Sequence, residues 1–240
     1  MTLLRAACFT DVGKVRQENE DRYLFNETAM FFGVADGVGG LPGGAEAAQA
    51  TVDSVASQLL AVAATEPLDL VSIVARANDA VVELGLHMSP GVGIGSTLTF
   101  GCIRGSRIHL AHVGDSRAFS LRNGQLTCLT EDHSVENEAK RRRARGEVVY
   151  YNEAHRGALT RCMGQPSAPD VDLLSLPLRA SDRYVFCTDG VTRMVTEKEL
   201  RDLVGQGEKP EQIARDLVSL AVERGGPDNA TVVAVIIDAA

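Results

Sequence analysis

The 240-residue sequence predicts an α+β fold in which two packed β-sheets are covered by helices. Strand-like segments come in runs and helical segments in pairs, whereas a parallel α/β sheet would need the two to alternate regularly. Two segments, Met30–Ala35 and Thr231–Ile237, are nearly uninterrupted apolar runs, as in strands buried on both faces. One sheet with a solvent-exposed face could not bury such segments, so the sequence favours a two-sheet core.

The N-terminal part is expected to contribute three strands, a glycine-rich loop and two helices. In chain order, the strands are expected at Leu3–Thr10, Tyr23–Asn26 and Met30–Ala35, and the helices at Ala45–Ala64 and Leu70–Leu86. Residues 37–44, GVGGLPGG, hold too many glycines for a helix or strand and therefore form a loop. Apolar residues at helical spacing indicate the first helix, and Pro67 suits the start of the second.

After residue 95, β-branched and apolar residues gather in short segments separated by turn signals. Four consecutive strands are expected at Ser96–Ile103, Arg107–Val113, Arg117–Leu121 and Gln125–Leu129. Asn123-Gly124 is the clearest hairpin signal, so we expect an antiparallel meander. A basic helix, a strand, two helices and a buried strand should follow at Ser134–Gly146, Asp182–Thr188, Glu197–Val204, Pro210–Arg224 and Thr231–Ile237.

Composition and charge argue against several classes of protein. With 24 basic and 32 acidic residues the net charge is −8, and such a surface repels a polyphosphate backbone, so no nucleic-acid partner is expected. The longest apolar runs, Leu59–Ala64 and Val232–Ile237, are far shorter than the roughly 20 residues of a membrane span. Arg5 interrupts the N-terminal apolar stretch, so no signal peptide is expected. Five scattered cysteines without a CxxC motif favour reduced thiols in a cytoplasmic protein.

Four aspartates fall where apolar strands are expected to end or begin. Asp36, Asp115 and Asp189 follow such strands, and Asp228 precedes the last one. Each of them alone would usually mark only a turn. Together, at strand ends that converge, their charges would repel one another unless a cation neutralised them. Carboxylate oxygens suit Mg²⁺ or Mn²⁺, whereas the five histidines show no zinc-ligand spacing.

Other catalytic motifs are incomplete. Pro42 stands where a dinucleotide-binding GxGxxG loop needs its last glycine, and no GxxxxGK[ST] phosphate loop occurs. GDSRA at residues 114–118 nearly matches the GxSxG nucleophile elbow, but Ala118 replaces the final glycine. Arg16–Asp21, RQENED, is either a solvated charged loop or an anion-binding arginine followed by carboxylates of a metal site.

Eight segments of the sequence resemble a known family. In chain order they are GKVRQENED (13–21), VADGVGG (34–40), GSTL (95–98), VGDSRAF (113–119), LTEDHS (129–134), LTRCMG (159–164), CTDGV (187–191) and GGPDNATVV (225–233). In order and spacing they are similar to protein phosphatase 2C, the metal-dependent serine/threonine phosphatases, in its compact bacterial form. The resemblance implies a four-layer αββα sandwich, a single phosphatase domain over residues 1–240 and a flap at about residues 134–158.

The resemblance also implies metal ligands among the strand-end residues. It implies two tightly bound Mn²⁺ or Mg²⁺ ions, with Asp36 bridging them and the Gly37 carbonyl binding one. Asp189 and Asp228 would complete the site of the other ion. Asp115 would share a third, weaker ion with Asp189, or serve only as a turn residue.

Supporting residues follow from the same resemblance. Glu20 and Asp21 would act through metal-bound water, and Asn229 would support the ligands through hydrogen bonds. Arg16 would bind phosphoryl oxygens through its planar guanidinium. In the flap, Arg141, Arg142 and Arg143 would meet acidic or phosphorylated substrate, or form only a solvated helix face.

The implied activity is hydrolysis of phosphoserine and phosphothreonine in proteins by a metal-activated water. Val38 follows the Asp36-Gly37 pair where eukaryotic relatives often carry a histidine, so we expect no protein general acid. Two alternatives remain: a pseudo-phosphatase that binds phosphoproteins without hydrolysis, and a hydrolase of small phosphomonoesters. We expect a cytoplasmic monomer that acts in signalling on substrates of a serine/threonine kinase, with no membrane partner.

Overall fold

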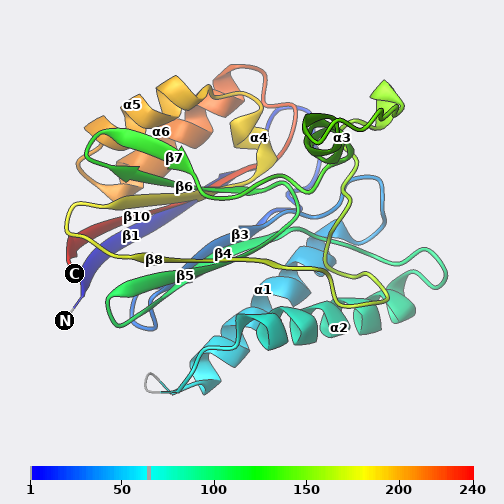
Figure 1. Cartoon of the computed structure of the whole chain (residues 1–240), viewed down its shortest axis with the longest axis horizontal. Coiled ribbons are helices and arrows are strands. Elements are labelled where there is room, and N and C mark those ends of the chain that lie inside the picture. The colour runs from blue at the N-terminus through cyan, green and yellow to red at the C-terminus, as the bar shows by residue number, and fades with distance from the viewer. Residues whose placement is uncertain (1, 64–65) are drawn as a thin grey trace.

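The computed structural model describes residues 2–63 and 66–240, and two five-stranded antiparallel sheets form its centre (Figure 1). One sheet has the strand order β1-β10-β9-β6-β7 and the other has the order β2-β3-β4-β5-β8. The first contains β1 (Leu3–Asp11), β10 (Ala230–Ala239), β9 (Arg183–Cys187), β6 (Arg117–Arg122) and β7 (Gln125–Cys128). The second contains β2 (Arg22–Asn26), β3 (Phe31–Ala35), β4 (Leu98–Arg104), β5 (Arg107–Val113) and β8 (Asp172–Pro177).

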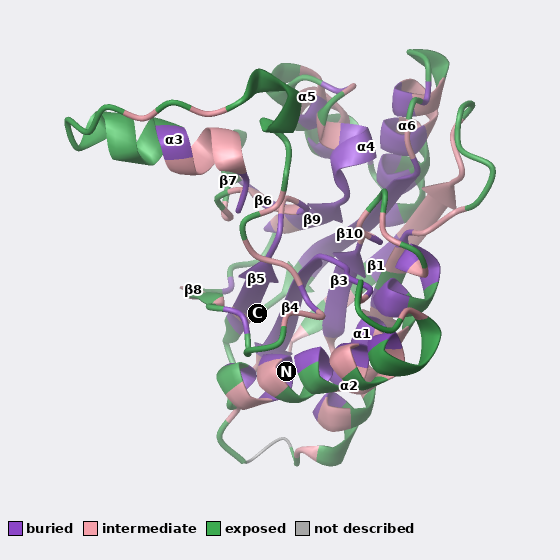
Figure 2. Cartoon of the chain, turned by 90° about the vertical axis from the view of Figure 1, so that its right-hand side faces the viewer, coloured by how far each residue is buried: buried purple, intermediate pink, exposed green. Residues whose placement is uncertain are grey.

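Helices cover the outer face of each sheet, which confirms the predicted αββα sandwich (Figures 1 and 2). α1 (Gly44–Ala61) and α2 (Leu70–Met88) lie over the second sheet, and α5 (Glu197–Gln206) and α6 (Pro210–Glu223) lie over the first. The remaining helices are α3 (Val135–Ala144), the 3₁₀ turn Glu153–His155 and α4 (Asp189–Thr192). None of the helices in the described part of the chain combines the length and apolar character that crossing a bilayer requires.

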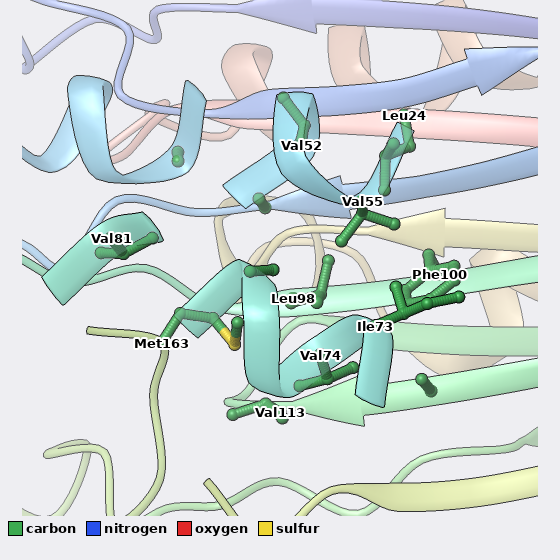
Figure 3. Packing of buried hydrophobic residues seen from close by; sticks show 14 of the residues in the cluster. Leu24, Val52, Val55, Ile73, Val74, Val81, Leu98, Phe100, Val113 and Met163 are labelled. Carbon is green, nitrogen blue, oxygen red and sulfur yellow. The ribbon is translucent and has the colours of Figure 1, made fainter. Parts of the chain in front are cut away.

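Apolar layers between the sheets and beneath the helices hold the sandwich together. Side chains of both sheets meet between them, and fully buried members of this layer are Phe32, Val34, Tyr184, Phe186 and Val233. A second layer joins α1 and α2 to their sheet, with Val55, Ile73, Leu98 and Phe100 at its centre (Figure 3). Because β3 and β10 contact apolar neighbours on both faces, their sequences are the nearly continuous apolar runs from which two packed sheets were predicted.

The strand pairing brings the predicted carboxylate positions to one end of the sandwich. In the second sheet, Val34 of β3 pairs with Thr99, and Leu98 pairs with Val113 at the end of β5. In the first sheet, Cys187 at the end of β9 pairs with Val232 near the start of β10. The residues that follow β3, β5 and β9, and those that precede β10, therefore lie near one another.

The predicted meander is wrong in one respect, because its four strands divide between the two sheets. β4 and β5 belong to one sheet, whereas β6 and β7 belong to the other. The chain crosses between the sheets at Gly114, whose φ of 114° suits glycine, and a Cβ there would overlap the side chain of Thr97. Hairpin signals give the order of strands but not the sheet that each one joins.

Smaller differences concern element ends and two short elements. The predicted helix over Ala45–Ala64 ends at Ala61, and Ala64 lies outside the described residues. The strand predicted to begin at Ser96 begins at Leu98. β8 and α4 were not predicted: β8 is a half-exposed edge strand without a clear alternating pattern, and α4 is a single turn.

We predict that Phe186→Ala lowers the free energy of unfolding by about 3–5 kcal/mol, because it leaves a cavity in the layer between the sheets. Urea denaturation measures the change. Leu86→Ala, at an exposed position of α2, is the control and should shift stability by less than about 0.5 kcal/mol. Equal effects of the two substitutions would contradict the described packing.

Candidate metal centre

A cavity of about 640 Å³ opens at the end of the sandwich where the strand ends gather. Its acidic lining consists of Asp36, Asp115, Asp189 and Asp228. Gly37, Val38 and the following glycine loop form one wall, and Arg16 and Arg193 are its two basic residues. The structure therefore brings together the four aspartates that were singled out by their position next to apolar strands.

Asp36 is held by backbone and hydroxyl contacts at the end of β3. Its backbone N–H donates to Thr97 Oγ1 at 2.9 Å, and its carbonyl accepts from the Thr97 N–H at 2.8 Å. Burial raises the pKa of the Asp36 carboxyl well above its ordinary value, and the neighbouring charges of Asp21 and Asp189 raise it further. Such an environment disfavours an unpaired negative charge and favours either a proton or a cation.

Asp21 lies deeper than the sequence suggested. Its Oδ2 accepts hydrogen bonds from Thr188 Oγ1 at 2.8 Å and Thr231 Oγ1 at 2.7 Å, two hydroxyls that the sequence analysis missed. Its Oδ1 is buried and has no hydrogen-bond partner among the residues that the structure describes. Burial raises the pKa of Asp21 to about 7, although these two hydrogen bonds act to lower it. Asp21 thus has one oxygen fixed by threonines and a second one available.

Asn229 ties the N-terminal acidic loop to β10. Its Oδ1 accepts from the Glu20 N–H at 2.8 Å, and its Nδ2 donates to the carbonyls of Val12 and Glu18, both at 2.9 Å. The amide side chain therefore fixes the backbone that carries Glu20. Burial also raises the pKa of the Glu20 carboxyl.

Two glycines allow this end of the sandwich to close. A Cβ on Gly37 would come within about 2.5 Å of the Gly44 carbonyl carbon, and one on Gly190 would overlap the backbone oxygen of Asn229. Larger residues would push apart the loop after Asp36, or the contact between α4 and the start of β10. The glycines that follow Asp36 and Asp189 are therefore required by close packing as well as by the turn.

Two guanidinium groups pair with the carboxylates. Arg16 Nη2 lies 2.9 Å from Asp228 Oδ2. Arg193 forms an ion pair with Asp189 and lies 3.8 Å from Asp115 Oδ2. The sequence analysis missed Arg193, although its position four residues after Asp189 is the spacing of neighbours on a helix.

The residues fit a hard divalent cation. Across residues 2–63 and 66–240, no three His, Cys, Asp or Glu side chains are grouped so that they could hold a metal ion as they stand. The carboxylates nevertheless raise one another's pKa, and Asp21 Oδ1 and Asp189 Oδ1 are buried without partners. An all-oxygen donor set of this kind suits Mg²⁺ or Mn²⁺. Arg16 brings positive charge to Asp228, and Arg193 brings it to Asp189.

The flap arginines contact residues within the flap or just before it. Arg141 lies 3.4 Å from Glu131, and Arg142 lies 2.6 Å from Glu147. Arg143 donates to the Val149 carbonyl and covers the Tyr151 ring. α3 extends to one side of the sheets (Figure 2), and none of these three arginines is among the residues that line the cavity.

This fold, with a carboxylate-lined cavity and an arginine at its wall, fits the class of metal-dependent phosphatases. The chain matches the protein phosphatase 2C family over residues 9–230, and it belongs to this family. It is 30% identical over 234 residues to a serine/threonine phosphatase stp of Listeria welshimeri, covering 94% of this chain and 93% of that protein.

The chain is also similar to PstP, a serine/threonine protein phosphatase of Mycobacterium tuberculosis. Identity is 31% over 233 residues, covering 96% of this chain but only 44% of the length of that protein. Among solved structures, the catalytic domain of PstP in complex with two manganese ions gives a TM-score of 0.81 at 32% identity, covering 99% of each chain. PppA of Pseudomonas aeruginosa gives 0.83 at 30% identity, covering 98% of this chain and 97% of that one.

We predict that the affinity for Mn²⁺ rises with pH between about 6 and 8. Asp21 and Asp115 have pKa values raised to about 7, so protons must leave the cluster when a cation binds at lower pH. Each proton released below its pKa changes the affinity by about tenfold per pH unit. Calorimetry at pH 6, 7 and 8 measures this slope, and Asp21→Asn should make it shallower. A pH-independent affinity in wild type would contradict the protonated cluster.

Proposed function

We propose that this protein is a metal-dependent phosphatase that hydrolyses phosphoserine and phosphothreonine in proteins. The observation that carries the proposal is the carboxylate cluster that lines one cavity together with Arg16. Membership of the protein phosphatase 2C family and the serine/threonine phosphatases among its relatives support the same activity. The relative solved with two manganese ions supports a two-ion centre.

The aspartates and one backbone carbonyl would hold the ions. Asp36 would be shared by both, the Gly37 carbonyl would bind one, and Asp189 and Asp228 would complete the other. When bound, the ions supply a Lewis acid that lowers the pKa of water and so provides the nucleophile near neutral pH. Glu20 and Asp21 would accept hydrogen bonds from water in the cluster, and Asn229 would keep the Glu20 backbone in place.

Arg16 would bind the phosphoryl group. It lies on the loop before β2. Its guanidinium lies close to Gly39, where a Cβ would come to 3.4 Å from Arg16 Nη2. By turning away from Asp228, Arg16 would direct its planar donors at phosphoryl oxygens instead. The same contact would stabilise the charge that develops on those oxygens in the transition state.

The carboxyls of the cluster would give up their protons when cations bind, so the leaving oxygen needs another proton donor. No histidine is among the residues that line the cavity, and Val38 carries no exchangeable proton. His133 directly precedes the flap in the sequence. Its side chain accepts from the Gly114 N–H, pairs with Asp172 and is buried. Water in the cavity would therefore supply the proton.

Several finer assignments belong to the same proposal. We treat residues 1–240 as one phosphatase domain with a flap at residues 134–158, whose Arg141, Arg142 and Arg143 could meet substrate only by leaving their present partners. The resemblance also predicts a third, weaker ion at Asp115, the position to which the Arg193 guanidinium reaches in this structure. A monomeric, cytoplasmic protein remains the expectation, and the five cysteines are free.

Turnover of a phosphothreonine peptide tests the proposal directly. With Mn²⁺ present, release of phosphate from the peptide should exceed release from nucleotides. Binding of the peptide without turnover would favour the pseudo-phosphatase, and preference for nucleotides would favour a hydrolase of small phosphomonoesters. Chelation should abolish activity, and added Mn²⁺ should restore it.

Asp36→Asn should lower kcat by several orders of magnitude, because it weakens the ligand that both ions would share. The substitution keeps the shape of the side chain and relieves repulsion in the cluster, so the fold should persist and circular dichroism should be unchanged. Steady-state kinetics on the phosphopeptide measures the loss. Near-normal turnover by the folded variant would be incompatible with this centre.

Arg16→Ala should raise KM and also lower kcat, by about 10²-fold, because the same oxygens gain charge in the transition state. Arg16→Lys should recover only part of the rate, since an ammonium cannot reproduce the planar fork. Lys14→Ala is the control, because Lys14 lies in the same loop but its amine donates to the Glu223 carbonyl, away from the carboxylates of the cavity. Unchanged kinetics in both Arg16 variants would show that Arg16 does not bind the phosphoryl group.

A further inference from the structure

Arg193 lies between two of the cavity's carboxylates. α4 begins at Asp189, and the Arg193 N–H donates to the Asp189 carbonyl at 2.8 Å, so one helical turn fixes the two residues relative to each other. The Arg193 guanidinium pairs with the Asp189 carboxylate and reaches to 3.8 Å from Asp115 Oδ2. Among the described residues, Arg193 is the ion-pair partner that Asp115 has.

The burial of the three groups differs. The side chains of Asp115 and Asp189 are each 12% exposed, whereas that of Arg193 is 53% exposed. Two nearly buried negative charges therefore meet one positive charge that enters from the solvent side. Arg193 lines both the main cavity and a second cavity of about 580 Å³ beneath the flap, and Gly157 of the flap lies close to its guanidinium.

We propose that Arg193 takes the place of a third divalent ion between Asp115 and Asp189, so that this chain binds two ions rather than three. The inference rests on the proposed metal centre. A divalent ion between Asp115 and Asp189 would have to displace the Arg193 guanidinium or lie next to it. Two positive charges in direct contact repel each other. Asp115 is then neutralised by a fixed residue, and Arg193 acts as a positioning residue for Asp189.

Arg193 differs from Arg16 in how it is attached. Arg16 lies on a loop and pairs with Asp228, from which a side-chain rotation can release it. Arg193 belongs to the turn that also carries Asp189, and it contacts two carboxylates rather than one. A divalent ion bound to Asp36, Asp189 and Asp228 still leaves Asp115 for the guanidinium. This geometry favours a guanidinium that keeps its contact with Asp115 when the two ions are bound.

Counting bound Mn²⁺ by calorimetry and by anomalous scattering tests the inference without any measurement of activity. Wild type should bind two ions. Arg193→Ala should bind a third and weaker ion, and Arg193→Ala combined with Asp115→Asn should return to two. Arg156→Ala is the matched control, because Arg156 lines the second cavity without an ion-pair partner among the described residues, and it should leave two.

Each possible count decides the question. A third ion between Asp115 and Asp189 in wild type, or only two ions in folded Arg193→Ala, would overturn the role of Arg193 while leaving the two-ion centre intact. No bound ion in wild type would overturn the metal centre itself. Should Arg193→Ala not fold, the anomalous map of wild type still decides whether the position between the two aspartates holds metal or guanidinium.

Discussion

Repulsion among buried carboxylates at one end of the sandwich is the constraint around which the surrounding structure is arranged. Burial and neighbouring negative charge both raise the pKa of Asp36, and the same causes act on Asp21 and Asp115. Hydroxyls of Thr188 and Thr231 stabilise one oxygen of Asp21 but leave the other without a partner. The remaining free-energy cost favours protons or cations at the cluster, and Arg16 and Arg193 supply two guanidinium groups there.

The two-sheet frame makes that crowding possible. Strand ends from both sheets meet because the layer between the sheets fixes their spacing, and glycines then let the loops approach without clashes. Asn229 joins the N-terminal loop to β10 through three hydrogen bonds. A change in packing between the sheets would therefore move Asp36 and Asp21 as well as lower stability, since the threonines that hold them lie at strand ends.

The sequence predicted the architecture and the acidic centre better than the connections between them. Continuous apolar runs identified β3 and β10 because such strands are buried on both faces, and aspartates next to apolar strands identified the cavity. Division of the meander between sheets could not be predicted, because hairpin signals are local. Asp21 is held in its buried position by Thr188 and Thr231, which lie 167 and 210 residues away from it in the chain. Arg193 was missed because α4 was expected to be only a turn.

Anomalous diffraction from crystals soaked in Mn²⁺ tests the central claim most directly, namely that the crowded carboxylates form a two-ion centre. The account predicts two peaks in the main cavity, both in contact with Asp36, one also near the Gly37 carbonyl and the other near Asp189 and Asp228. It further predicts that Arg16 no longer pairs with Asp228. A cavity that shows no peak at saturating Mn²⁺, with Arg16 still on Asp228, would contradict it.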